Sequence, residues 1–461
     1  MVEDHPTQDA LERFILGRLP AVERRSVLRH LLSGCSLCQE ATVGLWTPEE
    51  ADLESLLPFV DLEGDSAGEP TDPYDQVFDR VFHRVAAKEA LAARERALGR
   101  ELFEELIQHP AARQHLLVSN SVRFRSRTLC EILLQESLDA GFRDVVRSLE
   151  LARLALTLVG FLAEESCGGA EILESLKARA WAQLANAHRV NQDIRSAEDA
   201  FAHAEPYLSV PGRIGLIDKA RVLDLLASLR KDQRRFAEAT QLLDRVGSIY
   251  RRLGQWHLLG RTLQQKAMVV GEAGDPETQI GLLRRSLDLL DPQENPRIFL
   301  AARHNLILAL NDSGRSREAF ALLFHTRPLY LKLGDRMNLL RLRWLEGMVA
   351  RGLQRNDQAE AAFREVRDAF LDLGLQYDAA LAALDLASIY IQQGRHDEVC
   401  RIAEETLGIF QAGNMHREAI LALMVFSNTV RQEQAGIKTV QRISDFLKKS
   451  RQNPELRFTV S

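Results

Sequence analysis

Apolar residues recur every three or four positions along most of the chain, which is the spacing of amphipathic helices. The stretch "DQRRFAEATQLLDRVGSIYRRLG" is typical, because its apolar residues share one helical face and its charged residues the other. Alternating runs of β-branched residues, which would indicate strands, are nearly absent. The pattern therefore predicts an all-α protein.

The helical pattern itself repeats, with a period of forty residues held through five units. Each unit reads as two helices joined by a turn, with an apolar face too wide to bury alone, so stacking of neighbouring units is predicted to form a continuous core. Three columns carry the repeat: a turn column of Arg234, Gly274, Gly314, Gln354 and Gly394, a mostly small column of Ala227, Ala267, Ile307, Gly347 and Ala387, and a large column of Tyr250, Leu290, Tyr330, Phe370 and Phe410.

These columns, together with the "EA" pairs Glu238-Ala239 and Glu318-Ala319 that open second helices, resemble the tetratricopeptide repeat family. The common period of that family is about thirty-four residues, so the helices here are expected to be about one turn longer. The resemblance covers residues 167–450. It implies a right-handed superhelical solenoid of helical hairpins that binds a protein or peptide in a concave groove and does not catalyse a reaction.

In tetratricopeptide repeats the first helix of each hairpin lines the groove. Positions three and six residues before the small column, and four after it, lie on one stripe of that helix. Guanidinium groups there suit carboxylates, which points to an acidic peptide, although pairing with neighbouring acidic residues on a solvated face is the alternative. The basic and aromatic members of the stripe are Arg221, Lys231, Arg261, His304, Arg341, Trp344 and Arg351.

Composition separates the rest of the chain into further segments. Residues 74–166 are helical in pattern and are expected to form a cap and one irregular hairpin before the repeats. Residues 47–73 contain no lysine or arginine and are rich in proline, glycine and carboxylates, which is typical of a flexible acidic linker. This linker is itself a candidate ligand for the groove. Residues 451–461 are expected to be a C-terminal tail.

Residues 1–46 contain a cluster of potential metal ligands, "RHLLSGCSLCQE". It supplies His30, Cys35 and Cys38, and His5 lies upstream, so two imidazoles and two thiols offer a tetrahedral zinc set. A metal would also stabilise a unit that is too short to bury a firm apolar core. Two alternatives remain: buried packing residues, and a metal-free redox pair.

The layout "ALERFILGRLPAVERRSVLRHLLSGCSLC" resembles the zinc-binding anti-sigma factor domain. The resemblance implies one structural zinc held by His5, His30, Cys35 and Cys38, and it suggests a sigma factor as a partner. The spacing departs from that family, because four residues instead of three separate His30 from Cys35.

Charge and motif content narrow the function further. The formal net charge of −6 gives no general attraction for nucleic acid, and the apolar runs are too short and too charged to span a membrane. Five cysteines do not make a disulfide framework, and the acidic N-terminus does not read as a signal peptide, so a cytoplasmic location is expected. Common nucleotide-binding and hydrolase fingerprints are absent from the sequence. The sequence therefore predicts a non-enzymatic regulatory or adaptor protein, with a plain interaction scaffold or a thiol-redox sensor as alternatives.

Overall fold

The computed structural model describes residues 5–7, 10, 23, 26–27, 30, 73–141, 144–210, 212–412, 417–431, 436–450 and 457–458. The chain divides into two compact units, Met1–Ala86 and Ala87–Ser461, and each is described by itself. Regular structure in the described ranges is helical throughout, without strands, which confirms the all-α prediction. None of the helices described is long and apolar enough to cross a membrane.

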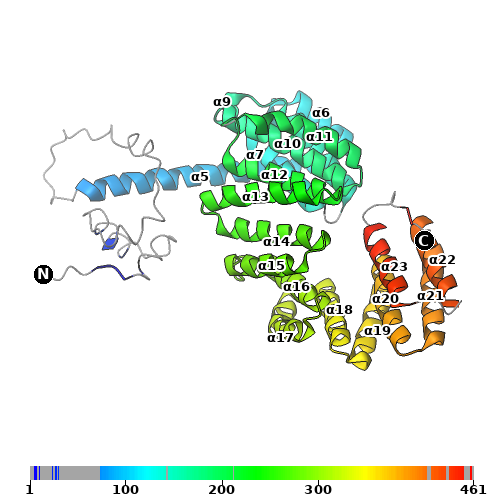
Figure 1. Cartoon of the computed structure of the whole chain (residues 1–461). Coiled ribbons are helices and arrows are strands. Elements are labelled where there is room, and N and C mark those ends of the chain that lie inside the picture. Colours follow the sequence, from blue (N-terminus) through cyan, green and yellow to red (C-terminus); the bar gives the residue numbers. More distant parts are fainter. Residues whose placement is uncertain are drawn as a thin grey trace, which may run out of the picture. The chain divides into compact units, whose positions relative to one another are not determined.

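The second unit is dominated by consecutive helical hairpins, which follow one another along the chain in Figure 1. In each hairpin the two helices pack against each other, and the second helix packs against the first helix of the next hairpin. The predicted solenoid is thereby confirmed. The pairs are α10 (Ala170–Val190) with α11 (Ile194–Ser209), α12 (Leu216–Asp232) with α13 (Phe236–Arg252), α14 (Trp256–Glu272) with α15 (Pro276–Leu289), α16 (Pro296–Asp312) with α17 (Ser316–Leu333), α18 (Arg336–Gly352) with α19 (Asn356–Asp372), α20 (Gln376–Gln392) with α21 (His396–Ala412), and α22 (Arg417–Arg431) with α23 (Ile437–Ser450).

The repeat columns have the structural roles that their residue types imply. All five members of the large column are buried, and Tyr330, Phe370 and Phe410 are at most 2% exposed. All five turn residues have positive φ, including the two that are not glycine, Arg234 at 59° and Gln354 at 61°. A left-handed residue lets each first helix end and the second begin after a short turn.

The small column allows close approach between the two helices of a hairpin. Gly347 in α18 shows this most directly, because a Cβ atom there would lie 2.7 Å from Cε1 of Phe363 in α19. Contacts that short do not occur between carbon atoms in a packed core, so only glycine fits this position without movement of the partner helix.

The helices before the repeats are α5 (Pro73–Ile107), α6 (Ala111–Asn120), the 3₁₀ turn η1 (Val122–Phe124), α7 (Arg127–Ala140), α8 (Val145–Val159) and the short α9 (Glu164–Cys167). Helices α7 and α8 pack against each other, and both pack against α10. Leu129, Leu133, Leu154, Leu158 and Leu176 share one buried cluster there, so the core of the hairpin continues into the first repeat.

At the C-terminal end, α23 turns back onto the first helix of the preceding hairpin and packs against α20. Leu381 and Leu384 of α20 are buried in one cluster with Val440, Ile443 and Leu447 of α23. The face of α20 that would line a groove is thus part of the apolar core.

Candidate binding groove and candidate metal centre

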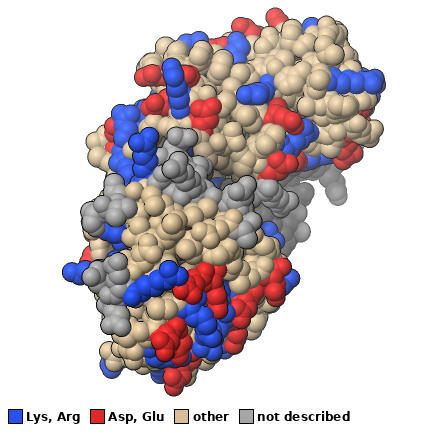
Figure 2. All heavy atoms as spheres, turned by 90° about the vertical axis from the view of Figure 1, so that its right-hand side faces the viewer, with Lys and Arg blue, Asp and Glu red and all other residues tan. Residues whose placement is uncertain are grey.

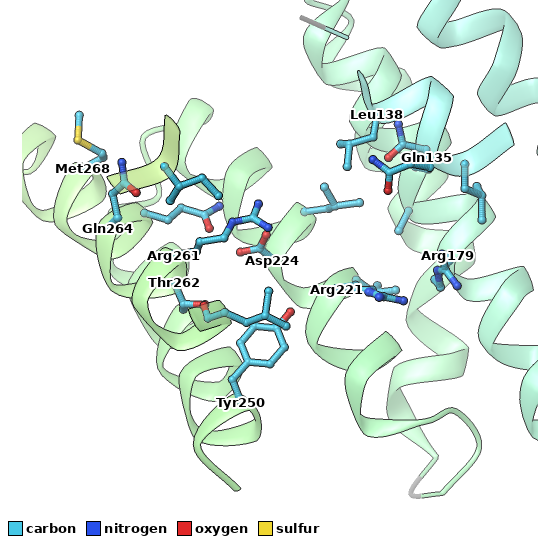
Figure 3. A pocket seen from close by; sticks show the side chains of 18 of the residues that line it. Gln135, Leu138, Arg179, Arg221, Asp224, Tyr250, Arg261, Thr262, Gln264 and Met268 are labelled. Carbon is cyan, nitrogen blue, oxygen red and sulfur yellow. The ribbon is translucent and has the colours of Figure 1, made fainter. Parts of the chain in front are cut away.

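Two neighbouring cavities lie against the first helices of the hairpins. The larger has a volume of about 640 Å³ and is lined from α7, α10, α12, α13, α14 and α16 (Figure 3). The smaller has a volume of about 480 Å³ and is lined from α16, α17 and α18, with Asp335 from the turn before α18. Arg297 and Ala301 of α16 line both cavities, so the two are parts of one surface, here called the first-helix groove.

Four of the seven residues predicted for the groove line it. Arg221 and Arg261 line the larger cavity, and His304 and Arg341 line the smaller one. All three of these arginines are exposed, and His304 is half-buried. The shared helical stripe therefore places these side chains on one continuous surface, as the repeat phase implies.

The other three predicted residues line neither cavity and contact carboxylates of the chain. The ammonium group of Lys231 lies 3.6 Å from Oε1 of Glu272. Nε1 of Trp344 donates a hydrogen bond to Oδ2 of Asp385 at 2.8 Å, and Nη1 of Arg351 donates to Oδ1 of the same residue at 2.6 Å. For these residues the contacts are those of the alternative interpretation, pairing with neighbouring acidic side chains.

The groove arginines differ in whether they have a partner. Arg221 donates to Oδ1 of Asp218 at 3.0 Å, and Arg179 of the preceding hairpin lies 3.5 Å from the same oxygen. By contrast, no described residue forms a hydrogen bond or an ion pair with Arg261, Arg297 or Arg341. The guanidinium groups of Arg297 and Arg341 are therefore available to an anionic ligand, whereas that of Arg261 faces the carboxylate of Asp224.

One acidic side chain lies in the centre of the larger cavity. Asp224 points toward Arg261 in Figure 3, with Tyr250 beneath it. Burial raises the pKa of the Asp224 carboxyl to about 6, while the positive charge of Arg261 and the amide of Gln265 act in the opposite direction. Burial also raises the pKa of Tyr250 to about 12, and the neighbouring Asp224 carboxylate adds to this effect. The phenol is therefore neutral at physiological pH.

The smaller cavity contains a neutral polar pair. Nδ1 of His304 lies 2.6 Å from the hydroxyl oxygen of Tyr330, within hydrogen-bonding distance. Burial, together with the positive charge of Arg341, lowers the pKa of His304 to about 4. The imidazole is uncharged at neutral pH, so the positive charge in this cavity comes from Arg297 and Arg341.

Two groove arginines lie outside the predicted rows. Arg297 is one helical turn before Ala301, an uncharged member of the row six residues before the small column, so both residues lie on the same face of α16. Residues one helical turn to either side of a row share its face, and Arg297 could be predicted on that basis. Arg179 is displaced by two residues from the forty-residue phase, and the sequence repeat alone gives no signal for it.

Of the predicted metal ligands, the structure describes only the two histidines. Nδ1 of His5 lies 3.2 Å from Nε2 of His30, although the residues are separated by twenty-five positions. Two nitrogens that bind one tetrahedral zinc at about 2.0–2.1 Å lie about 3.3 Å apart, so this spacing fits a shared ion. Cys35 and Cys38 fall outside the described residues, as does the predicted linker up to residue 72. Within the part that is described, no three histidine, cysteine or acidic residues gather as a metal site.

No model of a known protein family matches the sequence, and no curated protein matches it either. Among solved structures, the chain is similar to a Signal Transduction ATPase with Numerous Domains that has a tetratricopeptide repeat sensor, from Pyrococcus horikoshii. The identity is 12%, the TM-score is 0.51, and the match covers 77% of this chain and 52% of that one. This similarity concerns the fold, and it agrees with a tetratricopeptide-like solenoid.

Two further matches have lower TM-scores. A Rap protein complexed with Competence and Sporulation Factor matches at 12% identity and a TM-score of 0.49, over 70% of this chain and 88% of that one. Aspartyl phosphate phosphatase F from Bacillus subtilis matches at 14% identity and a TM-score of 0.47, over 89% and 96% of the two chains.

Proposed function

We propose that this protein is a non-enzymatic regulatory or adaptor protein that holds a segment of another protein in the first-helix groove. The observation that carries the proposal is the set of exposed guanidinium groups that line this groove without a partner among the described residues. An arginine without a carboxylate is an efficient recognition element for one, because its planar fork can donate two parallel hydrogen bonds. The preferred ligand is therefore acidic.

The charge pattern on one face of the molecule supports this assignment by contrast. Figure 2 shows lysine and arginine interspersed with aspartate and glutamate on one face of the molecule, and many of the charged side chains described form ion pairs within the chain. Mixed charge of this kind gives little attraction for a charged partner. The groove arginines are thus the more selective feature.

The test is affinity capture with the full chain, read by mass spectrometry, beside a variant that carries Arg261→Gln and Arg341→Gln. Arg285→Gln is the matched control, because Arg285 is an exposed arginine of α15 outside the groove. We expect partners that bind the wild type and the control to be lost with the double variant. If all three proteins retain the same partners, the groove does not bind them and the proposal fails.

We also propose that residues 1–46 form a zinc-stabilised module that engages a sigma factor or another transcription regulator. The resemblance of its sequence layout supports this, as does the 3.2 Å spacing of the His5 and His30 nitrogens. When bound, the zinc would be structural and would stabilise the fold of a small unit. There are two alternatives. If the module is only structural, the protein is a plain interaction scaffold. If its cysteine thiolates are readily oxidised, the protein is a redox sensor.

Metal analysis of the full chain tests the ligand set. We expect about one zinc per chain in the wild type, and loss of the metal in a Cys35→Ser, Cys38→Ser double variant. Cys400→Ser is the matched control, since Cys400 lies in α21 within the repeats. A metal-free wild-type protein, purified without chelator, would exclude the zinc. Capture by the full chain, but not by a chain that lacks residues 1–46, would assign the sigma factor to this module.

A further inference from the structure

The smaller cavity of the first-helix groove differs from the larger one in the groups that an anion would meet. In the larger cavity Asp224 faces Arg261, so a bound anion lies near a carboxylate of the chain. The smaller cavity has one acidic lining residue, Asp335, and its carboxylate accepts the backbone N–H of Asn338 at 2.8 Å and caps α18. The positive end of the helix dipole offsets the charge of Asp335 there. The smaller cavity is therefore the more favourable of the two for an anion.

Two arginines supply the positive charge of this cavity. Arg297 of α16 and Arg341 of α18 line it, both side chains are exposed, and no described residue forms a hydrogen bond or an ion pair with either. Arg341 lies near the His304–Tyr330 pair, because burial lowers the pKa of His304 and raises that of Tyr330, and the charge of Arg341 acts on both groups. Each guanidinium can donate two parallel hydrogen bonds to an oxyanion.

The His304–Tyr330 pair adds one donor, whichever way its internal hydrogen bond runs. Between them, the neutral imidazole and the phenol carry one N–H and one O–H. The 2.6 Å contact between Nδ1 and the hydroxyl oxygen uses one of these two protons. If the phenol donates, the N–H at Nε2 of the imidazole remains, and if Nδ1 donates, the phenolic O–H remains. Both side chains line the cavity, so the remaining donor is available to a ligand there.

These donors exceed what one carboxylate can accept. A carboxylate has two oxygens, about four acceptor positions and a single charge. The two guanidinium groups and the remaining donor of the pair offer about five hydrogen bonds, and the amide of Asn305, which has no described partner, adds to them. A phosphoryl group has three acceptor oxygens and a charge of about −1.5 to −2 at pH 7. It therefore matches both the number of donors and the two positive charges.

We infer that the smaller cavity is a binding site for a phosphoryl group, which is held by Arg297 and Arg341 together with the one donor that the His304–Tyr330 pair leaves free. This rests on the proposed function and deepens it, because it assigns the anion of the bound segment to one cavity and names its chemistry. A carboxylate in the same cavity leaves donors without an acceptor, so it is expected to bind less tightly.

Two short capped peptides of alanine and glycine test the inference on the full chain. One carries a central phosphoserine, and the other carries two adjacent central glutamates, so that their charges are similar at about pH 7.5. Both carry a fluorophore, and binding is measured by fluorescence anisotropy. We expect the phosphoserine peptide to bind about tenfold more tightly, because a single group then pairs with both arginines.

Competition with inorganic phosphate identifies the source of the phosphoryl group. If the bound segment carries it, phosphate should displace the phosphoserine peptide only at concentrations well above the Kd of the peptide. If phosphate competes at that Kd, the cavity binds the same group as a free anion. Both results support the phosphoryl site and distinguish its source, whereas phosphate that never displaces the peptide contradicts the inference.

Single substitutions assign the contacts. Arg341→Gln is expected to weaken binding of the phosphoserine peptide about tenfold. Arg341→Lys keeps the charge but loses the paired donors, and it should weaken binding about threefold. Arg285→Gln on α15, outside the groove, is the matched control and should leave the affinity unchanged.

Two results with the peptides overturn the inference. If both peptides bind equally well and both require Arg341, the groove binds acidic segments without selecting a phosphoryl group, so the inference fails and the proposed function stands. If neither peptide binds, the inference also fails, and the proposed function is then judged by the capture experiment alone.

Discussion

The first helices of successive hairpins have the same repeat positions but two different environments. In α12, α14 and α18 the position six residues before the small column is an exposed arginine, whereas in α20 it is Leu381, which is buried. Three residues before the small column, α12 has Asp224 and α20 has Leu384, which is 1% exposed. The difference follows from α23, which packs on α20 and converts a groove position into a core position. The position of a residue in the repeat therefore does not decide whether it is exposed, because a helix from outside the hairpin can pack over it.

Residues of the large column also differ according to the residue that faces them on the first helix. In α17 the large residue is Tyr330, and its hydroxyl contacts His304 of α16. In α19 it is Phe370, and its ring contacts Trp344 of α18 edge-to-face, with centroids 5.6 Å apart. The phenolic hydroxyl therefore occurs where the first helix supplies a polar partner, and phenylalanine occurs where the partner is apolar. This is expected, because a buried hydroxyl needs a hydrogen bond.

The largest effect is expected from uncovering α20. Ile443→Asp places an unpaired carboxylate in the cluster that holds Leu381 and Leu384, and it should lower the free energy of unfolding by about 4 kcal/mol or more. Solenoid contacts are local, so the loss should concentrate in the C-terminal hairpins. Hydrogen exchange measures this directly, because amides of α20 should lose protection while those of α12 keep theirs.

Gln441→Asp is the control for this prediction, since Gln441 is exposed on the same helix. It adds the same charge without entering the core and should change stability by less than about 0.5 kcal/mol. Protection of α20 that survives Ile443→Asp would show that α23 is not its cover, and the distinction between the two environments would then lose its physical basis.

Much of the solenoid could be predicted from the sequence, because helix packing leaves a strong signal. The turn column requires left-handed backbone, and the forty-residue phase predicts the turn even at Arg234 and Gln354, which are not glycine. The tight fit at Gly347 is likewise encoded in a column of small residues. These features are local, so each hairpin repeats them.

The groove could be predicted only in part, because partners across helices are not periodic. Arg341 and Arg351 of α18 both lie in predicted groove rows, yet only Arg351 pairs with a carboxylate among the described residues. Its partner, Asp385 of α20, lies outside those rows. The cover over α20 was signalled by Leu381, Leu384 and Ile391, three apolar residues in groove rows, and it could have been inferred from them. The zinc site and the acidic linker stay predictions.

Exchanging the hydroxyl between the two environments should give an intermediate effect. Tyr330→Phe removes the partner of His304 Nδ1 and should cost about 1–2 kcal/mol of unfolding free energy. Phe370→Tyr should cost a similar amount, because it adds a hydroxyl beside Trp344 and Phe370 is only 2% exposed. Both are measured by chemical denaturation. Should either substitution prove neutral, the pairing of hydroxyl with polar partner has no energetic importance at that position.

The smallest effect expected is a pH dependence of ligand binding in the larger cavity. Burial raises the pKa of Asp224 to about 6, so its carboxyl is mostly ionised at pH 7.5 and mostly protonated at pH 5.5. When ionised it competes with a ligand carboxylate for Arg261, and when protonated it does not. Glutamates of the ligand, with a pKa of about 4.3, stay ionised over this range. The affinity of the groove for an acidic peptide should therefore rise about threefold as the pH falls from 7.5 to 5.5.

His304 does not produce this increase, because burial lowers its pKa to about 4 and the imidazole stays neutral throughout that interval. Asp224→Asn should bind with the higher affinity at both pH values, whereas Asp288→Asn, at an exposed position of α15, should retain the wild-type pH dependence. An increase that persists in Asp224→Asn would assign the titration to another group. If instead the affinity falls as the pH falls, the carboxylates that titrate in this range belong to the ligand. Asp224 then does not compete with the ligand for Arg261. The larger cavity, unlike the covered face of α20, would then still be open to the ligand, but Asp224 would not change the binding affinity with pH.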